Sequence, residues 1–196
     1  ARREAITFVP RGFGTNLSGG TIVADQGLII CLSRLNRILG IYPENRYAVV
    51  QPGVTNLELQ DATGALGYFY APDPASQKVS TIGGNLGENS GGPRCLKYGV
   101  TSNHILGMEM ILPDGEIVRT GGAALDPPGL DLRGAMVGSE GTLGVVTEIT
   151  VRILPQTEKV ITMLAIYDTI ADAAKSVSGL MSDGILPNTM EMMDAT

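Results

Sequence analysis

Short apolar runs, alternating or continuous and bounded by turn-forming residues, dominate the first 155 residues of the chain. Such runs predict β-strands, because successive strand side chains point to opposite faces of a sheet and turns interrupt them. The expected strands are residues 6–9, 27–32, 47–50, 107–112, 116–119 and 145–153. The segment Pro113-Asp114-Gly115-Glu116 predicts a tight turn, so the strands on either side of it form a hairpin.

One helix is expected among these strands. Thr55 is a typical N-cap, and Glu58 stands three residues later, as a capping box requires. Leucines follow, and Gly64 and Gly67 lie near the expected end of the helix.

After Leu154-Pro155 the pattern changes to a β-α-β unit. Residues 159–166 predict a strand, Asp168 caps a helix that Gly184 ends, and residues 188–193 predict a second strand. A unit of this size cannot close a core of its own. We therefore expect one domain at residues 1–157 and the beginning of a second at residues 158–196.

The composition is that of a globular protein, with 17% charged and 43% hydrophobic residues in a chain of 196. The 14 basic and 20 acidic residues give a formal net charge of −6, and no basic run is present. This argues against a nucleic-acid partner, because phosphate binding on that scale needs clustered Lys and Arg. No apolar stretch approaches the length of a membrane span, and no signal peptide is visible.

The two cysteines and the one histidine restrict the metal chemistry. Cys31 lies in an apolar run and is expected to be a buried thiol, Cys95 follows Pro93-Arg94 in a glycine-rich loop, and both are expected to be unpaired. His104 is favoured as a half-buried loop residue rather than a catalytic one. Ordinary zinc sites need more nitrogen and sulfur ligands than this chain offers.

Glycine is over-represented, with 26 residues, or about 13% against an average near 7%. One concentration lies within "PRGFGTNLSGGT" at residues 10–21, where backbone N–H groups could approach a phosphate without an intervening side chain. The segment is neither a P-loop, since Gly20 stands where the lysine should be, nor a dinucleotide fingerprint, since Leu17 replaces the third glycine. Taken alone, it could equally be a tight turn.

Two further glycine-rich segments follow. "APDPASQ" at 71–77 leads into "STIGGNLGENSGG" at 80–92, which combines paired glycines with short amide and hydroxyl side chains suited to a polar ligand. "GSEGTLGVVT" at 138–147 would allow a flat ring to lie against the backbone. Each segment alone favours a surface turn, but three of them in one β-rich chain favour a ligand site.

Five motifs occur in an order that identifies a family. They are Arg-Gly-x-Gly-Thr-x-x-Ser-Gly-Gly, Pro-Asp-Pro, Thr-Ile-Gly-Gly-Asn, Asn-x-Gly-Gly-Pro-Arg-x-x-x-Tyr-Gly and Gly-Ser-Glu-Gly-Thr-Leu-Gly. Over roughly residues 5 to 155 the chain resembles the FAD-binding domain of the vanillyl-alcohol-oxidase, or PCMH-type, flavoproteins. Within them it is most similar to the FAD-linked subunit of glycolate oxidase and to D-lactate and other D-2-hydroxyacid dehydrogenases.

The resemblance implies an α+β fold. A PCMH-type FAD-binding domain contains two α+β subdomains, and here its N-terminal part is expected to be missing, because family members have a further helix and two strands before the first glycine loop. The start of a ferredoxin-like cap domain is expected to follow.

The resemblance also implies the residues that bind FAD. The pyrophosphate is assigned to Arg11, Gly12, Phe13, Gly14, Thr15 and Asn16, with Ser18 and Gly19 continuing the loop. The central portion of FAD is assigned to Pro72, Ser76, Thr81, Ile82, Gly83, Gly84 and Asn85, and the flavin side to Asn89, Ser90, Gly91, Gly92 and Tyr98. The adenosine side is assigned to Glu140, Gly144, Val145 and Val146. FAD is expected to be non-covalent, because the pyrophosphate loop has neither His nor Cys and Cys95 lies outside the usual attachment site.

The implied activity is oxidation of a small D-2-hydroxy acid, such as glycolate or D-lactate, by hydride transfer to the flavin. The family's catalytic and metal-binding residues would lie beyond residue 196, so none is assigned here and this chain alone is expected to be inactive. Electrons would leave through an iron–sulfur or second flavin subunit, or to a quinone or cytochrome. The expected location is the cytoplasm, or the inner membrane surface through partner subunits.

Two alternatives belong to other classes of protein. One is a non-catalytic flavin-binding or electron-transfer subunit of an oxidoreductase complex. The other is a β-rich scaffold with no ligand, which would be colourless when purified.

Overall fold

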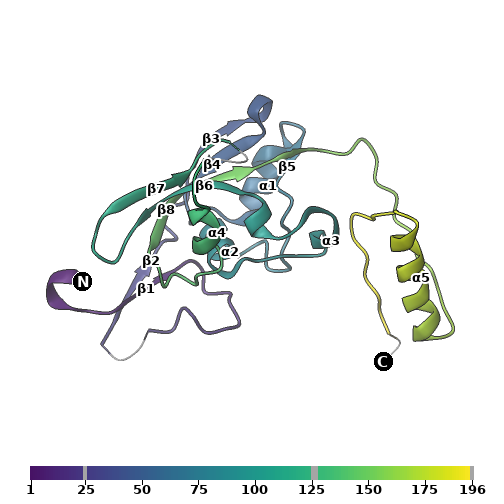
Figure 1. The fold of residues 1–196 in the computed structure, drawn as a ribbon, viewed down its shortest axis with the longest axis horizontal. Helices are drawn as coiled ribbons and strands as arrows, with labels where there is room; N and C mark the ends of the chain where they lie inside the picture. The colour runs from purple at the N-terminus through teal and green to yellow at the C-terminus, as the bar shows by residue number, and fades with distance from the viewer. Residues whose placement is uncertain (24–25, 125–127, 195–196) are drawn as a thin grey trace.

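A computed structural model describes residues 1–23, 26–124 and 128–194 of the chain. Its centre is a five-stranded antiparallel sheet in the order β3-β4-β8-β6-β7 (Figure 1). These strands are β3 (Ile38–Tyr42), β4 (Tyr47–Val50), β6 (Ile105–Ile111), β7 (Ile117–Gly121) and β8 (Val145–Arg152). Two smaller sheets accompany it: β1 (Phe8–Arg11) pairs in parallel with β2 (Leu28–Cys31), and β5 (Tyr68–Phe69) pairs antiparallel with β9 (Leu154–Pro155).

The α-helices are α1 (Asn56–Gly64), α2 (Ile82–Glu88), α3 (Cys95–Tyr98), α4 (Leu132–Met136) and α5 (Ile170–Ser182). Short 3-10 turns lie at Arg2–Glu4, Pro43–Asn45 and Thr101–Asn103. The mixed α+β fold class that the sequence predicts is confirmed.

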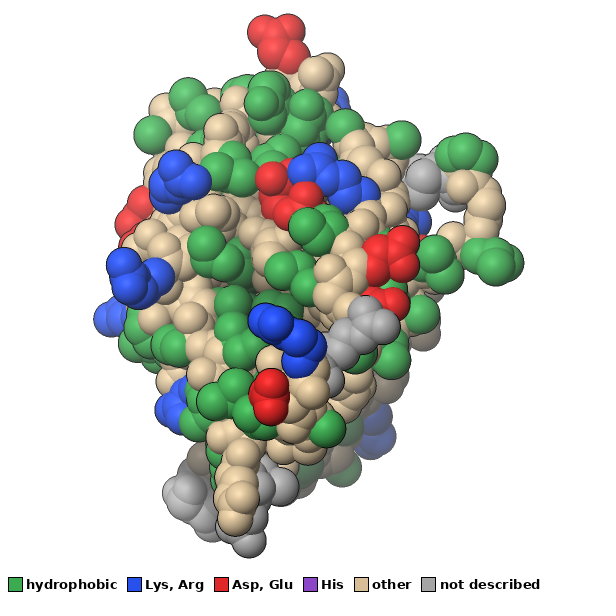
Figure 2. Space-filling view, turned by 90° about the vertical axis from the view of Figure 1, so that its left-hand side faces the viewer, with side chains coloured by type: hydrophobic (Ala, Val, Ile, Leu, Met, Phe, Trp, Pro, Cys, Tyr) green, Lys and Arg blue, Asp and Glu red, His purple; other side chains and the backbone are tan. Residues whose placement is uncertain are grey.

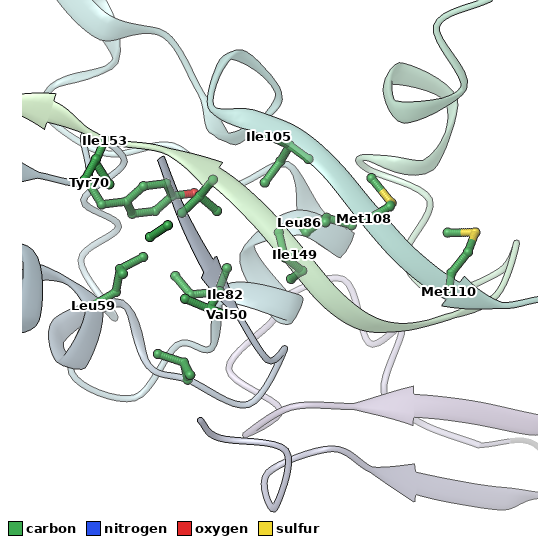
Figure 3. Close-up of a cluster of buried hydrophobic side chains, with 13 residues drawn as sticks. Val50, Leu59, Tyr70, Ile82, Leu86, Ile105, Met108, Met110, Ile149 and Ile153 are labelled. Carbon is green, nitrogen blue, oxygen red and sulfur yellow. The ribbon is translucent and has the colours of Figure 1, made fainter. Parts of the chain in front are cut away.

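The core lies between one face of the central sheet and helices α1 and α2 (Figure 3). The sheet contributes inward residues such as Val50 and Ile149, and the helices contribute Leu59, Ile82 and Leu86, each at most 2% exposed. Burying side chains of this size stabilises the fold by about 1.5–3 kcal/mol each. Helix α2 is therefore held firmly against the sheet, and it becomes a fixed wall for the loops beside it.

Most of the expected elements are present. Helix α1 begins after Thr55 with the predicted capping box: Thr55 Oγ1 accepts from the Glu58 N–H at 3.2 Å, and the Thr55 N–H donates to Glu58 Oε2 at 2.8 Å. The expected strands correspond to β1, β2, β4, β6, β7 and β8, with β1 beginning two residues later than predicted. The hairpin turn between β6 and β7 contains Gly115 at a φ of 91°.

The sequence did not indicate strand β3 or helix α2. Helix α2 lies inside the glycine-rich segment 80–92 and begins after the N-cap Thr81. Its C-cap is Asn89, which has a left-handed backbone conformation (φ 48°). Glycines are poor helix formers, but a side chain at Gly83 would bring its Cβ within 2.5 Å of Pro52 Cβ. Close packing on Pro52 therefore explains a glycine inside this helix.

The C-terminal segment is partly as predicted. Helix α5 is confirmed, although Thr169 rather than Asp168 is its N-cap, and Gly184 (φ 75°) follows its end. The strands predicted at 159–166 and 188–193 are wrong, since neither range is assigned as a strand. A strand needs a partner for its N–H and C=O groups, and within the described residues none pairs with either range. Figure 1 shows α5 and its flanking segments set apart from the rest of the molecule. The division at residue 157 stays a prediction.

Cys31 and His104 differ from expectation. Cys31 is exposed rather than buried, because the narrow β1–β2 sheet covers only one side of it, and its Sγ lies 3.2 Å from Ser33 Oγ. Both Cys31 and Cys95 are free thiols, as predicted. His104 is 2% exposed rather than half-buried, since its ring packs edge-on against the buried Tyr70 and its Nε2 lies 2.9 Å from the Tyr98 carbonyl oxygen. Its burial lowers its pKa.

Charged side chains are dispersed over the surface. On the face in Figure 2, Lys, Arg, Asp and Glu are dispersed among hydrophobic and neutral groups, in places with an acidic group beside a basic one. Among the described residues, no helix is both long and apolar enough to cross a bilayer, and no group of three or more His, Cys, Asp or Glu could hold a metal ion.

Candidate cofactor-binding site

A cavity of about 420 Å³ lies where the three glycine-rich segments meet. Residues 10–18 and 20–21 form one wall, residues 80–81 and 83–88 at helix α2 form a second, and residues 139–141 with Gly144 form a third. Its volume is within the range of small-molecule and cofactor pockets. Three segments that lie about 60 residues apart in sequence thus line one cavity.

The first wall offers unpaired backbone donors. Within the described part of the chain, the N–H groups of residues 13–18 have no hydrogen-bond acceptor. The side chain of Asn16 holds the loop shape: with its amide oriented to suit its neighbours, its oxygen accepts from the Gly19 and Gly20 N–H groups at 3.2 and 2.9 Å. The free donors therefore belong to residues 13–18, and each of these residues lines the cavity.

Arg11 adds a positive charge to this wall. Gly14 has a φ of 72°, and a Cβ there would lie 2.6 Å from Arg11 Nη2, so the guanidinium lies directly over Gly14. Arg11 forms no ion pair with any described carboxylate. Free amides beside an unpaired cation form an anion-binding site of the kind that holds phosphates.

The second wall is rigid, and its backbone donors are already used. The N–H groups of Ile82 and Gly83 donate to the carbonyls of Val54 and Pro52 at 2.8 Å, and the Gly84 N–H donates to Thr81 Oγ1 at 3.1 Å. Helix α2 therefore offers a fixed surface rather than free amides. The loop approaches it closely, since a Cβ on Gly12 would lie 2.3 Å from Thr81 Oγ1.

Two side chains of this wall are polar, buried and unpartnered. Ser80 is 4% exposed and Asn85 is 1% exposed, and neither Ser80 Oγ nor Asn85 Nδ2 has a hydrogen-bond partner among the described residues. An unpaired buried polar group costs about 1–3 kcal/mol. Because both residues line the cavity, a polar ligand is the natural partner. Sequence reasoning missed Ser80, although it directly precedes the Thr-Ile-Gly-Gly-Asn motif.

Acidic side chains occupy another part of the cavity. Ser18 Oγ lies 3.3 Å from Glu88 Oε2 and 3.2 Å from Glu140 Oε2. Burial and the neighbouring Glu140 carboxylate raise the pKa of Glu88. Glu140 was predicted, whereas Glu88 was not, because nothing in the motif order distinguishes it.

The structure brings together most of the residues that the resemblance assigned to FAD. Those that line the cavity are Arg11, Gly12, Phe13, Gly14, Thr15, Asn16, Ser18, Ser76, Thr81, Gly83, Gly84, Asn85, Ser90, Glu140, Gly144 and Val146. Those outside the cavity lining are Gly19, Pro72, Ile82, Asn89, Gly91, Gly92, Tyr98 and Val145. Ile82 and Val145 are core residues, at 0% and 6% exposed. Binding by each of these residues stays a prediction.

The segment assigned to the flavin side is held by an ion pair. Arg94 Nε lies 3.2 Å from Asp73 Oδ2, and the Arg94 N–H donates to Asp73 Oδ1 at 3.2 Å. A Cβ on Gly92 would lie 2.2 Å from the Asp73 carbonyl oxygen, so the two loops are in close contact. Burial raises the pKa of Asp73, and Arg94 opposes that shift.

Comparisons with known proteins show the family to which this chain belongs. Residues 1–121 match the family of FAD binding domains, and the chain belongs to that family. It is 50% identical over 190 residues to the glycolate oxidase subunit GlcD of Bacillus subtilis, covering 96% of this chain and 40% of that protein. It is 36% identical over 190 residues to a D-lactate dehydrogenase of Anaerostipes hadrus, again covering 96% of this chain and 40% of the relative.

A solved structure of alkyldihydroxyacetonephosphate synthase has the same fold, with a TM-score of 0.84 and 24% identity over 96% of this chain and 35% of the other. The FAD-binding family and fold that the sequence predicts are thereby confirmed, and the cavity residues fit the cofactor. The chain spans about two-fifths of the length of the curated relatives it matches.

Proposed function

We propose that this chain is the FAD-binding part of an enzyme that oxidises a small D-2-hydroxy acid, of the glycolate or D-lactate type. The supporting observation is that the N–H groups of residues 13–18 have no acceptor among the described residues. These residues lie on the wall of a cavity of cofactor size, beside Arg11, which forms no ion pair with a described carboxylate. The relatives named glycolate oxidase subunit and D-lactate dehydrogenase supply the substrate class.

Each wall of the cavity has a distinct task in this proposal. The free amides and Arg11 bind the diphosphate through charge-assisted hydrogen bonds. Ser80 and Asn85 donate to polar atoms of the ligand, and helix α2 excludes water on that side. Bound FAD supplies the hydride acceptor, and the chain's residues set its position.

FAD is bound non-covalently in this proposal. Thiol, imidazole and phenol side chains can each form a bond to flavin, and among the described residues no Cys, His or Tyr lines the cavity. Denaturing the FAD-loaded protein with acid should therefore release all of its yellow colour into the supernatant. Colour that stays with the precipitate would contradict this part of the proposal.

The group that removes the substrate's hydroxyl proton is proposed to lie in a second domain that begins near residue 158. The cavity's own carboxylates, Glu88 and Glu140, are beside Ser18 on the anion-binding loop, and no catalytic role is assigned to them. Electrons would leave to further subunits or to a quinone or cytochrome; the word subunit in the relatives' names supports the first route.

Cofactor selectivity tests the binding part of the proposal. FAD should raise the melting temperature of this chain, because a ligand at about 100 times its Kd stabilises the folded state by about 2.7 kcal/mol. FMN lacks the second phosphate and NAD lacks the flavin, so both should give much smaller shifts. Equal shifts with FMN and FAD would mean that the cavity does not recognise a diphosphate.

Substrate oxidation needs a separate test. A protein extended to the length of the curated relatives should lose its oxidised-flavin absorbance anaerobically with glycolate or D-lactate, and much more slowly with L-lactate. The 196-residue chain loaded with FAD should be bleached by dithionite but by neither acid. An extended protein that is bleached by dithionite alone would favour the non-catalytic electron-transfer subunit.

A further inference from the structure

The surface around α3 carries two cations packed on two aromatic rings. The guanidinium carbon of Arg94 lies 5.5 Å from the centre of the Phe69 ring, and Lys97 Nζ lies 5.5 Å from the centre of the Tyr98 ring. The two rings meet edge to face, with their centres 5.5 Å apart. These four residues, from β5 and from the segment at α3, are called the α3 patch. Contact with a ring face favours a fixed position for each cation.

The outer end of Arg94 is not used. Its Nε lies 3.2 Å from Asp73 Oδ2, and its backbone N–H donates to Asp73 Oδ1 at 3.2 Å. Among the described residues, none accepts a hydrogen bond from the terminal nitrogens Nη1 and Nη2. The side chain of Arg94 is 36% exposed and that of Asp73 is 14% exposed. Asp73 therefore anchors the guanidinium from the inside, and the outer edge remains able to bind a carboxylate.

The C-terminal segment brings a carboxylate close to this place. Burial is the main cause of the raised pKa of Asp73, and the charge of Glu191 raises that pKa further. Glu191 is therefore within electrostatic reach of Asp73 and of the guanidinium that Asp73 anchors. Glu191 is exposed and forms no ion pair with a described Lys or Arg. Figure 1 likewise shows α3 on the side of the molecule that faces the C-terminal segment.

The residues that lead up to Glu191 are partly covered. Pro187, Asn188 and Met190 are half-buried, and Asn188 Oδ1 is buried without a hydrogen-bond partner among the described residues. The segment thus carries two acceptors that lack donors, the Asn188 amide oxygen and the Glu191 carboxylate. Because the α3 patch carries donors that lack acceptors, the two surfaces are complementary.

We propose that the α3 patch is the docking surface for residues 187–191, with Glu191 accepting hydrogen bonds from the terminal nitrogens of Arg94. Docking places the carboxylates of Asp73 and Glu191 on different edges of one guanidinium, and Lys97 balances the second negative charge. The partner of this surface is therefore the acidic C-terminal segment of the same chain.

This contact joins the C-terminal segment to the wall of the cavity. Ser90 lines the cavity, and Gly92 follows it closely in the chain. A Cβ on Gly92 would lie 2.2 Å from the Asp73 carbonyl oxygen, so the support of Arg94 is packed directly on that wall. The α3 patch itself lies outside the cavity lining. The contact thus sets the C-terminal segment against the cavity whatever ligand the cavity binds.

Carbodiimide coupling tests the contact directly, because it joins a carboxylate to an amine that lies against it. The 196-residue chain carrying Arg94→Lys is treated at low protein concentration, and cross-linked peptides are identified by mass spectrometry. The pair Lys175 and Asp172, whose charged atoms lie 3.3 Å apart, is the internal control for the reagent. An amide bond from Glu191 to residue 94 or to Lys97 is the expected result. Coupling of the control pair without either of these bonds would overturn the proposal.

A double-mutant cycle measures the energetic coupling of the two side chains. Amide hydrogen exchange of residues 185–194 is compared in the wild type, Glu191→Gln, Arg94→Met and the double variant. Each single change should speed exchange about two- to fivefold, as expected for loss of a partly exposed ion pair. The double variant should exchange no faster than the single variants, because the second change has no interaction left to remove. Glu158→Gln removes the same charge from an exposed carboxylate that is in no ion pair with a described residue, and it should leave the rate unchanged.

Two results of the cycle would overturn the proposal. One is an effect of Glu158→Gln as large as that of Glu191→Gln, which would mean that net charge alone matters. The other is an unchanged exchange rate in Glu191→Gln. Because Glu191 is exposed, that variant keeps the fold, and its result decides the question even if Arg94→Met is unstable.

Discussion

The contact between Gly12 and Thr81 joins the anion-binding loop to helix α2, and it can be tested by a double-mutant cycle. A Cβ on Gly12 would lie 2.3 Å from Thr81 Oγ1, the same atom that accepts the Gly84 N–H as the N-cap of α2. Thr81 is 2% exposed and cannot swing into solvent. Gly12→Ala must therefore displace the hydroxyl or the loop, and it should cost about 1–3 kcal/mol of stability.

Thr81→Ala removes the hydroxyl and the cap, for a cost of about 1 kcal/mol. In the double variant the added methyl on residue 12 enters the space that the hydroxyl has left. Its cost should therefore be close to that of Thr81→Ala alone, well below the sum of about 2–4 kcal/mol that independent sites would give. The expected coupling is about 1–3 kcal/mol, a normal range for residues in contact.

Urea unfolding of the four cofactor-free proteins, followed by circular dichroism, measures each term. Gly122→Ala is a matched control, because nothing lies within 4 Å of the Cβ it would add. It should leave stability unchanged or slightly raised. If the Gly12 and Thr81 costs add to within about 0.5 kcal/mol, the loop does not pack on the cap and the site geometry is wrong.

Three further changes test the anion-binding loop and the buried histidine. Gly14→Ala should weaken FAD binding and cost about 1 kcal/mol of stability, because Gly14 has a φ of 72° and Arg11 Nη2 lies 2.6 Å from the added Cβ. Gly115→Ala is the control: Gly115 has a φ of 91°, but nothing lies within 4 Å of the added Cβ, so this change should lower stability without affecting FAD binding. Arg11→Met should raise the Kd for FAD about five- to tenfold at low salt and less at high salt, as titrations at two ionic strengths would show. His104→Gln keeps a donor for the Tyr98 carbonyl and should reduce acid sensitivity. The pKa of His104 is lowered in the folded state, so the unfolded chain takes up a proton first as the pH falls below about 6.5. The free energy of unfolding of the wild type should therefore fall, relative to that of the variant, by up to about 1.4 kcal/mol per pH unit. Parallel pH profiles of the two proteins in unfolding experiments would contradict this.

Local signals in the sequence predicted many of the elements but not their arrangement. The capping box at Thr55 and the alternating burial of β8 are local, and both were readable. The position of β8 between β4 and β6 could not be predicted from local sequence, because its pairing with β4 joins Val50 to Ile149 across about a hundred residues. Nothing in either segment alone favours that partner.

Helix α2 shows tertiary packing overriding propensity. Paired glycines predict a loop, yet Thr81 caps the segment and Pro52 requires a residue without a side chain at Gly83. The same packing places Ser80 and Asn85 on the cavity with unpaired polar atoms. Such unpaired groups cannot be identified before the partners of every neighbour are known.

The two glycine segments also explain why composition alone could not decide which one binds the anion. Both offer backbone N–H groups without side chains in the way. At Gly83 and Gly84 those groups already donate, to the Pro52 carbonyl and to Thr81 Oγ1, whereas those of residues 13–18 have no acceptor among the described residues. The difference arises because α2 is packed on the core, so the N–H groups of its first turn must find acceptors within the protein. In the first loop, by contrast, the Asn16 side chain accepts only from the Gly19 and Gly20 N–H groups, and the other N–H groups are left without an acceptor among the described residues. An anion is therefore expected at residues 13–18, with α2 as its supporting wall.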